Sequence, residues 1–165
     1  MRNLLFIIYL IILVIAPLNF GMWLLTDKAE AKHKHLEKEY QNKFCEFMEG
    51  YEEYVLPNKR RIDCLERSYA IEVDFAYKIF EGIGQAEYYA YMTNRKPGLL
   101  LIMEKDNDLN TVREFHSYLL DYKKLDYYII YSIDDYFYVI KPETVEDIPN
   151  SLKNIKTGVL LNASK

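Results

Sequence analysis

The chain of 165 residues is half apolar and 28% charged, which is typical of a folded globular protein and excludes an intrinsically disordered one. Its length fits one domain with a sizeable core rather than two. The net charge of −4 argues against a protein that coats nucleic acid by charge alone, but it leaves room for binding through one local site. Sixteen tyrosines are an unusual number, for which biased nucleotide usage is a simpler explanation than a stacking function.

Residues 1–31 are expected to be a signal peptide or a membrane anchor. The run Leu4 to Leu25 contains no charged residue and as a helix would extend about 33 Å, enough to cross a bilayer. Read as an export signal, it follows the basic Arg2 and precedes a small-x-small cleavage pattern at Ala29-Glu30-Ala31. Lysines after the run outnumber the positive charge before it, which favours an anchor with a cytoplasmic domain. We expect export to the periplasm, with a membrane anchor through residues 4–25 as the alternative.

Residues 32–165 are expected to form one α/β domain with a mixed sheet flanked by helices. A strand, a helix and a fully apolar strand within about 35 residues predict a βαβ unit with a right-handed crossover. Asn94 and Lys96-Pro97-Gly98 are expected to stop the middle helix. The tail from Lys141 shows no strong pattern. In chain order, we expect a helix over 32–50, strands over 51–55 and 60–65, a strand from 69 that ends before 76, a helix over 79–93, a strand over 99–103, a helix over 109–122, and a hairpin of strands over 127–132 and 136–140.

The strand that begins at residue 69 shows two unlike faces. Ile71, Val73 and Phe75 form an apolar face, while Glu72 and Asp74 lie on the other. Two carboxylates side by side repel each other, so a lysine, an arginine or a metal ion is expected between them. The simpler alternative is that the acids form the solvated side of the strand.

Residues nearby in the predicted fold would complete a site around these acids. Asp63 on a neighbouring strand makes a third carboxylate, and carboxylate oxygens suit Mg²⁺ or Mn²⁺. Such an ion polarises a phosphate and activates water. Lys78, four residues after Asp74, is placed to orient that water or to balance charge. Gln85 and Tyr89 share one face of the following helix and are placed to hold a phosphate or an acid.

Together these residues resemble the PD-(D/E)xK nuclease superfamily. Asp63, the strand Glu72-Val73-Asp74 and the Gln85-x-x-x-Tyr89 helix are similar to small exported bacterial members of this type, over about residues 40 to 105. The resemblance implies a restriction-endonuclease-like fold, with Asp63 as the first metal-binding aspartate and Glu72 as the second acid. Gln85 and Tyr89 match the helix motif of the nuclease modules of recombination exonucleases.

The resemblance also concerns an upstream acid and the position of the family's lysine. Glu53 matches an acid that some members of the superfamily place upstream as a further metal ligand. The family's lysine is expected two residues after Glu72, where this chain has Asp74. Lys78 would then act as a migrated lysine, with Asp74 as an additional metal ligand.

The resemblance implies a metal-dependent phosphodiester hydrolase that acts on nucleic acid, without telling DNA from RNA. An alternative of a different class is an exported or anchored binding domain that keeps the nuclease fold with weak or no catalysis. The displaced lysine and the export signal favour this alternative, because genomic DNA does not lie across the membrane.

Cys45 and Cys64 are the two cysteines of the chain. In an oxidising compartment, an even pair in a small domain often forms a disulfide, whereas in the cytoplasm the two would be buried thiols. If the domain is exported, we expect a Cys45–Cys64 bridge worth about 3 kcal/mol through loop entropy. Neither cysteine has metal-ligand spacing with a histidine, so zinc is not expected.

Overall fold

The computed structural model describes residues 33–134, 136–148 and 159–162. Contacts divide the chain into residues 1–33 and residues 34–165, and the helices and strands of the described ranges belong to the second unit. Within those ranges, no helix is long and apolar enough to cross a bilayer. The expected signal or anchor over residues 1–31 lies outside the described residues.

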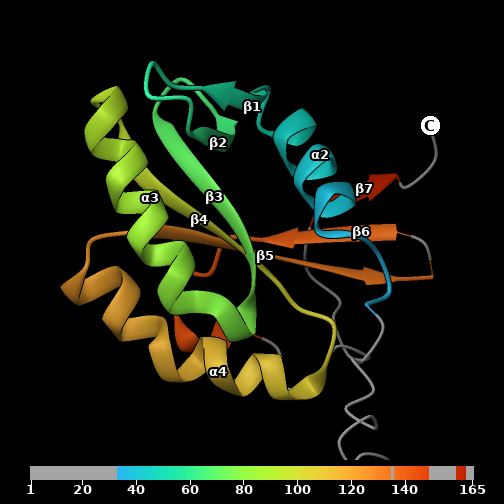
Figure 1. Cartoon of the computed structure of the whole chain (residues 1–165). Coiled ribbons are helices and arrows are strands. Elements are labelled where there is room, and N and C mark those ends of the chain that lie inside the picture. The colour runs from blue at the N-terminus through green and yellow to red at the C-terminus, as the bar shows by residue number, and fades with distance from the viewer. Residues whose placement is uncertain (1–32, 135, 149–158, 163–165) are drawn as a thin grey trace, which may run out of the picture. The chain divides into compact units, whose positions relative to one another are not determined.

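One seven-stranded mixed sheet organises the domain, and its strands lie side by side in the order in which the chain makes them (Figure 1). The three central strands β3, β4 and β5 are parallel, and the outer pairs are antiparallel. The predicted α/β class with a mixed sheet is confirmed. The strands are β1 (Tyr51–Val55), β2 (Arg61–Leu65), β3 (Tyr69–Phe75), β4 (Lys96–Ile102), β5 (Asp126–Ile133), β6 (Tyr136–Ile140) and β7 (Val159–Asn162).

Helices cover both faces of the sheet (Figure 1). Tyr40 and Phe44 of α2 pack on one face of the central strands, and the apolar sides of α3 and α4 pack on the other face. Two consecutive βαβ units, β3–α3–β4 and β4–α4–β5, build the parallel centre. The helices are α2 (Glu37–Phe47), α3 (Ile79–Thr93) and α4 (Asp106–Ser117), with short helical turns at Ala76–Lys78, Tyr118–Tyr122 and Val145–Asp147.

Two predicted elements have different bounds in the structure. The first helix, expected over 32–50, is α2 from Glu37 to Phe47, and β4 begins at Lys96 rather than at Leu99. Asn94 does end α3, in a left-handed conformation with φ of 53°. Pro97 and Gly98, however, pair with β3 in register. A Cβ on Gly98 would lie 2.8 Å from Cγ1 of Ile71, so glycine allows the two strands to pack closely at this point. The patternless tail also contributes a strand, β7, which pairs with β6.

A disulfide joins Cys45 of α2 to Cys64 of β2. The expected bridge is therefore present, and both cysteines are fully buried. Gly50 lies directly over it, because a Cβ at this position would come 2.6 Å from Sγ of Cys64 and 2.9 Å from Sγ of Cys45. The sequence pattern predicts that Gly50 ends a helix, but α2 ends at Phe47 and Glu49 adopts the left-handed conformation. The glycine is needed for space beside the disulfide.

Candidate functional site

Strand β3 presents its two acids to α3. The alternate residues from Ile71 to Phe75 join the core under α2, so Glu72 and Asp74 occupy the opposite face. Only 6% of Glu72 and 4% of Asp74 is exposed to solvent. The interpretation of these acids as the solvated side of a strand is therefore wrong. A pair of carboxylates has been placed between a helix and a sheet, where charge is costly.

Close packing of α3 explains this burial. A Cβ on Gly82 would lie 2.7 Å from Cδ1 of Leu99 and 3.5 Å from Cβ of Asp74. Glycine at this position lets the helix backbone approach the sheet directly over Asp74. The turn Ala76–Lys78 reverses the chain from the end of β3 into α3, which brings Lys78 back towards the same acid.

Asp63 reaches the site from β2. Strand β2 pairs with β3 only at Cys64–Ile71 and Leu65–Ala70, so β3 continues beyond its partner. The backbone N–H of Val73 donates a hydrogen bond to Oδ2 of Asp63 at 2.8 Å instead. Asp63 thus has a structural role as well as a place in the site, because it satisfies a donor that the diverging strand leaves unpaired.

Burial first, and then the charges of neighbouring acids, raise the pKa of all three carboxyl groups. Burial raises the pKa of Glu72 to about 9, and the charges of Asp63 and Asp74 add to this effect. Burial likewise raises the pKa of Asp63 to about 6, although the hydrogen bond from Val73 opposes the shift. The pKa of Asp74 is also raised to about 6 by burial. The arrangement therefore resists holding three negative charges at neutral pH.

Glu72 is the least compensated of the three acids. Its Oε2 atom is buried and has no hydrogen-bond partner among the described residues. A buried acceptor without a partner costs roughly 1–3 kcal/mol, more when the group is charged. Such a group in the middle of an acidic cluster fits a position where a cation or another ligand supplies the missing contact.

Lys78 pairs with Asp74 rather than with Glu72. Its Nζ lies 3.2 Å from Oδ1 of Asp74 and 3.7 Å from Oε2 of Glu37. The ammonium holds the pKa of Asp74 lower than burial alone would set it. The cation expected between Glu72 and Asp74 is thus Lys78, and it forms an ion pair with Asp74 but not with Glu72.

The two residues of the Gln85-x-x-x-Tyr89 motif on α3 differ in their burial. Tyr89 is buried, and burial followed by the negative charges of Glu72 and Asp63 raises the pKa of its hydroxyl. Its ring also packs in a small core with Leu56 and Ile62. Gln85, one turn earlier, is half-buried. Tyr89 is therefore part of the electrostatic environment of the acids.

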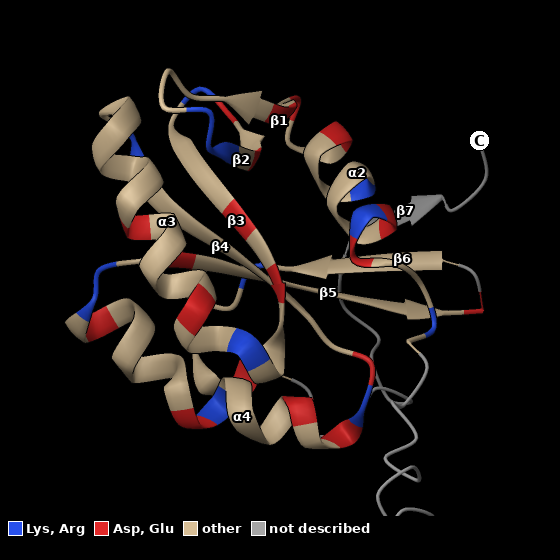
Figure 2. Ribbon diagram, in the orientation of Figure 1, with Lys and Arg blue, Asp and Glu red and all other residues tan. Residues whose placement is uncertain are grey.

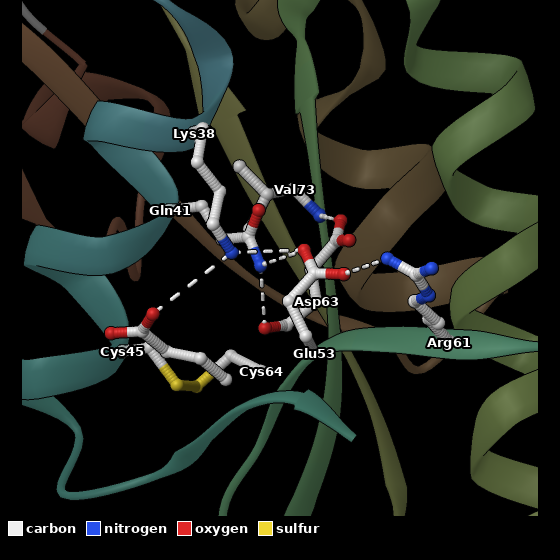
Figure 3. Close-up of polar contacts among 9 residues, drawn as sticks. Lys38, Gln41, Cys45, Glu53, Arg61, Asp63, Cys64 and Val73 are labelled. Atoms are coloured by element: carbon white, nitrogen blue, oxygen red, sulfur yellow. Dashed lines mark hydrogen bonds and ion pairs between the residues drawn. A yellow bond between two sulfur atoms is a disulfide. The ribbon is translucent and has the colours of Figure 1, made fainter. Parts of the chain in front are cut away.

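Glu53 lies in a polar network between α2 and the β1–β2 hairpin (Figure 3). The network reaches the backbone of Asp63, because Gln41 also donates a hydrogen bond to the carbonyl oxygen of Asp63 at 2.8 Å. Its carboxylate accepts hydrogen bonds from Lys38 at 2.9 Å, from Gln41 at 3.0 Å and from Arg61 at 3.2 Å. Lys38 first, then Gln41, lower its pKa to about 2. The upstream acid suggested by the family resemblance is thus already neutralised by its own partners.

Glu37 belongs to the site, although the sequence pattern does not single it out. It stands in the first turn of α2, beside Lys78, and its charge raises the pKa of Asp63, Glu72 and Asp74. No local pattern identifies it, because its contact with Lys78 crosses from one helix to the start of another. Only the packing of α2 on the sheet brings it close.

As they stand, the carboxylates do not close around an ion: within the described part of the chain, no three His, Cys, Asp or Glu side chains form a group that could hold a metal. The donor set nevertheless has the chemistry of a hard-cation site, because its ligands are carboxyl oxygens and one of them, Oε2 of Glu72, is buried without a partner among the described residues. Comparison of the chain with protein-family models, curated proteins and solved structures gives no match.

Proposed function

We propose that the domain is a metal-dependent phosphodiester hydrolase with a restriction-endonuclease-like fold, exported or anchored in the membrane, that acts on nucleic acid. One observation carries the proposal: Oε2 of Glu72 is buried and has no partner among the described residues, and burial, followed by the charges of Asp63 and Asp74, raises the pKa of this carboxyl to about 9. A divalent cation is the simplest group that relieves both the missing contact and the repulsion. The order of Asp63, Glu72-Val73-Asp74 and Gln85-x-x-x-Tyr89 supports the same interpretation through the family resemblance.

In this proposal, Asp63 and Glu72 hold Mg²⁺ or Mn²⁺, with Asp74 as the neighbouring acid. The chemistry that the ion supplies when bound is polarisation of a phosphate and activation of water. Lys78, held by Asp74 and Glu37, keeps a positive charge beside the acids. Tyr89 and Gln85 on α3 position the substrate from the other side.

The disulfide supports the proposed location. A buried Cys45–Cys64 bridge is typical of proteins that fold in an oxidising compartment. The apolar run over residues 4–25 supports export or anchoring independently.

The alternative function is a binding domain with weak or no catalysis. The observation that favours it is the commitment of Lys78 to Asp74 and Glu37, which leaves Glu72 without the lysine that its family counterpart has two residues later. In that case the site binds a ligand or a metal without turning over a phosphodiester.

Calorimetric titration of Mn²⁺ and Mg²⁺ into the full-length protein, followed by a hydrolysis assay on single-stranded and duplex DNA and RNA, tests both functions. We expect metal binding near millimolar concentration or tighter and hydrolysis that a chelator stops. Asp63→Asn and Glu72→Gln should abolish both, while Glu114→Gln, at an exposed acid of α4, should change neither.

Each outcome separates the two functions. Hydrolysis that survives in Glu72→Gln would contradict the proposed hydrolase. Metal binding without hydrolysis, unchanged in Lys78→Met, would establish the alternative instead.

A further inference from the structure

The tip of the β1–β2 hairpin lies against the outer side of α3. Nδ2 of Asn58 donates a hydrogen bond to the hydroxyl of Tyr88 at 2.6 Å. The guanidinium carbon of Arg60 lies 5.4 Å from the centre of the same ring. Two segments separated by about thirty residues of chain thus form one surface, with Tyr88 where they meet.

Two cations at this tip are not engaged in ion pairs among the described residues. Lys59 and Arg60 are exposed, and neither forms an ion pair with an acid of the described residues. Arg61, the next residue, is instead paired with Glu53 at 3.2 Å. Figure 2 shows the basic residues on the hairpin beside α3. The chain has a net charge of −4, but Lys59 and Arg60 form a local basic site that an anionic ligand can bind.

Aromatic rings extend from this basic tip along α3. We call Phe80, Tyr88 and Tyr91 the aromatic stripe, because they recur on one side of the helix and are 65%, 36% and 83% exposed. Gly84 lies between Phe80 and Tyr88, and a Cβ there would meet no atom within 4 Å, so the surface between these rings is open. Phe80 also packs edge-on against Phe115 of α4, with ring centres 4.9 Å apart, so it contributes to folding as well. A ring as exposed as that of Tyr91 offers a flat face to a ligand.

The stripe adjoins the acidic cluster. Tyr89 follows Tyr88 directly, and the two rings lie 5.7 Å apart. The charges of Glu72 and Asp63 raise the pKa of Tyr89, and the charge of Arg60 opposes them. The charge of Arg60 and the charges of the two acids therefore shift the pKa of the same hydroxyl in opposite directions. On α3 itself, the acid beside Tyr88 is Glu87, which is neutralised by Lys123 at 2.6 Å.

We propose that the hairpin tip and the aromatic stripe bind single-stranded nucleic acid, with phosphates on Lys59 and Arg60 and bases stacked on Tyr88 and Tyr91. This inference rests on the proposed function, since it names the form of substrate that reaches Asp63 and Glu72. A basic site beside exposed rings is the usual combination for strands whose bases are not paired. A duplex hides the faces of its bases and cannot use the stripe. An anionic membrane surface would use the lysine and arginine but has no flat faces to stack.

Fluorescence anisotropy of labelled oligo(dT) and oligo(U), measured with the full-length protein in excess chelator, tests this surface without hydrolysis. We expect Tyr91→Ala to weaken binding about 5- to 150-fold, the range for removal of one ring on which a base stacks. The double variant Lys59→Ala/Arg60→Ala should flatten the dependence of log affinity on log salt by roughly 0.7 for each phosphate that is no longer neutralised. Tyr91 is largely solvent-exposed, so its truncation leaves the fold intact, which the thermal midpoint checks.

Matched controls are available on the same domain. Tyr136→Ala removes a half-exposed ring from β6, and Arg67→Ala removes an exposed cation from the turn between β2 and β3. Both should bind oligonucleotide as the wild type does. Equal binding by Tyr91→Ala and wild type would overturn the proposal, as would equal affinity for a duplex of the same length. Binding to phosphatidylglycerol vesicles in place of oligonucleotide would also overturn it.

Failure of this inference and failure of the proposed hydrolase give different results. Oligonucleotide binding that depends on Tyr91 and Arg60, in a protein that hydrolyses nothing, would support the surface and remove the hydrolase. Hydrolysis that is lost in Asp63→Asn but unaffected in Tyr91→Ala and in the double variant would support the hydrolase and remove the surface.

Discussion

Glu53 on β1 and Glu72 on β3 bring the same carboxylate into two different surroundings. Hydrogen bonds from Lys38, then from Gln41 and Arg61, lower the pKa of Glu53 to about 2 (Figure 3). Burial, with the charges of nearby acids, raises the pKa of Glu72 to about 9. Glu53 has a partner for each oxygen, whereas Oε2 of Glu72 has none among the described residues.

The contrast shows that lack of counter-charge is local to the site and not general in this acidic domain. Lys38 and Arg61 neutralise Glu53 even though its carboxylate is partly exposed to water, where an ion pair contributes little to stability. Glu72 is buried, so a missing partner costs more free energy there, yet the ammonium of Lys78 pairs with Asp74 instead. Folding alone does not favour such an arrangement, and perturbed buried acids are most often found where a ligand completes them.

The largest expected loss of stability comes from removing the disulfide that joins α2 to β2 near Glu53. We expect Cys45→Ala/Cys64→Ala to lower the free energy of unfolding by about 3 kcal/mol, because the open chain gains entropy in the unfolded state. Urea unfolding followed by circular dichroism measures the change. Wild-type protein unfolded in excess dithiothreitol should reach the same midpoint as the double variant. Two free thiols in protein taken from its native compartment would contradict the bridge.

The second prediction concerns the uncompensated acid. The pKa of Glu72 is higher in the folded protein than in the unfolded chain, so the folded state binds the extra proton and loses stability as pH rises from about 4.5 to about 9. Glu72→Gln removes this ionisation. Without metal at pH 8, we expect it to raise the free energy of unfolding by roughly 1 kcal/mol or more.

Urea unfolding of Glu72→Gln and wild type at pH 5 and pH 8, with and without Mn²⁺, measures this effect. The difference between the two proteins should shrink at the lower pH. Mn²⁺ should stabilise only the wild type, and more so at pH 8, where the acid ionises on binding. A variant less stable than wild type at pH 8 without metal would contradict the assignment of Glu72 as uncompensated.

Much of the fold follows from local pattern. The helix over Ile79–Thr93 and the strand over Tyr51–Val55 match their predicted bounds, because periodicity and the left-handed Asn94 are local signals. Strand β4 starts earlier than predicted, since Pro97 and Gly98 are turn residues by composition and their pairing with β3 depends on contact with Ile71. Strand β7 is not predictable in this way, because four residues without pattern become a strand only beside β6.

The sequence predicts which residues belong to the site, but not which of them form ion pairs with one another. Alternation places Glu72 and Asp74 on one face of β3, and the family resemblance adds Asp63 and Tyr89. The sequence does not reveal that both faces of β3 are buried, because this depends on how α3 packs at Gly82. Nor does it show that Lys78 pairs with Asp74, or that Glu37 joins from α2. Charges are assigned to partners by tertiary contact, which a spacing pattern does not encode.

The smallest effect, and the sharpest test of the comparison, comes from the same substitution at the other acid. Glu53→Gln replaces an ionised partner of Lys38 and Arg61 by a neutral amide of nearly the same shape. The pKa of Glu53 is lowered on folding, so the stability it adds is present above about pH 4.5 and is lost as pH falls towards about 2. Because the carboxylate is partly exposed, we expect a loss of only about 0.5 kcal/mol at pH 7.

Paired urea titrations at pH 7 and pH 3 measure this loss, with Glu114→Gln, at an exposed acid of α4, as the control. The loss should shrink at pH 3 and in high salt, which screens exposed charges. Its sign is opposite to that expected for Glu72→Gln, although the two variants make an identical chemical change. If both substitutions shift stability in the same direction at pH 8 without metal, the two acids are not in opposite electrostatic surroundings, and the case for a ligand at Glu72 fails with that difference.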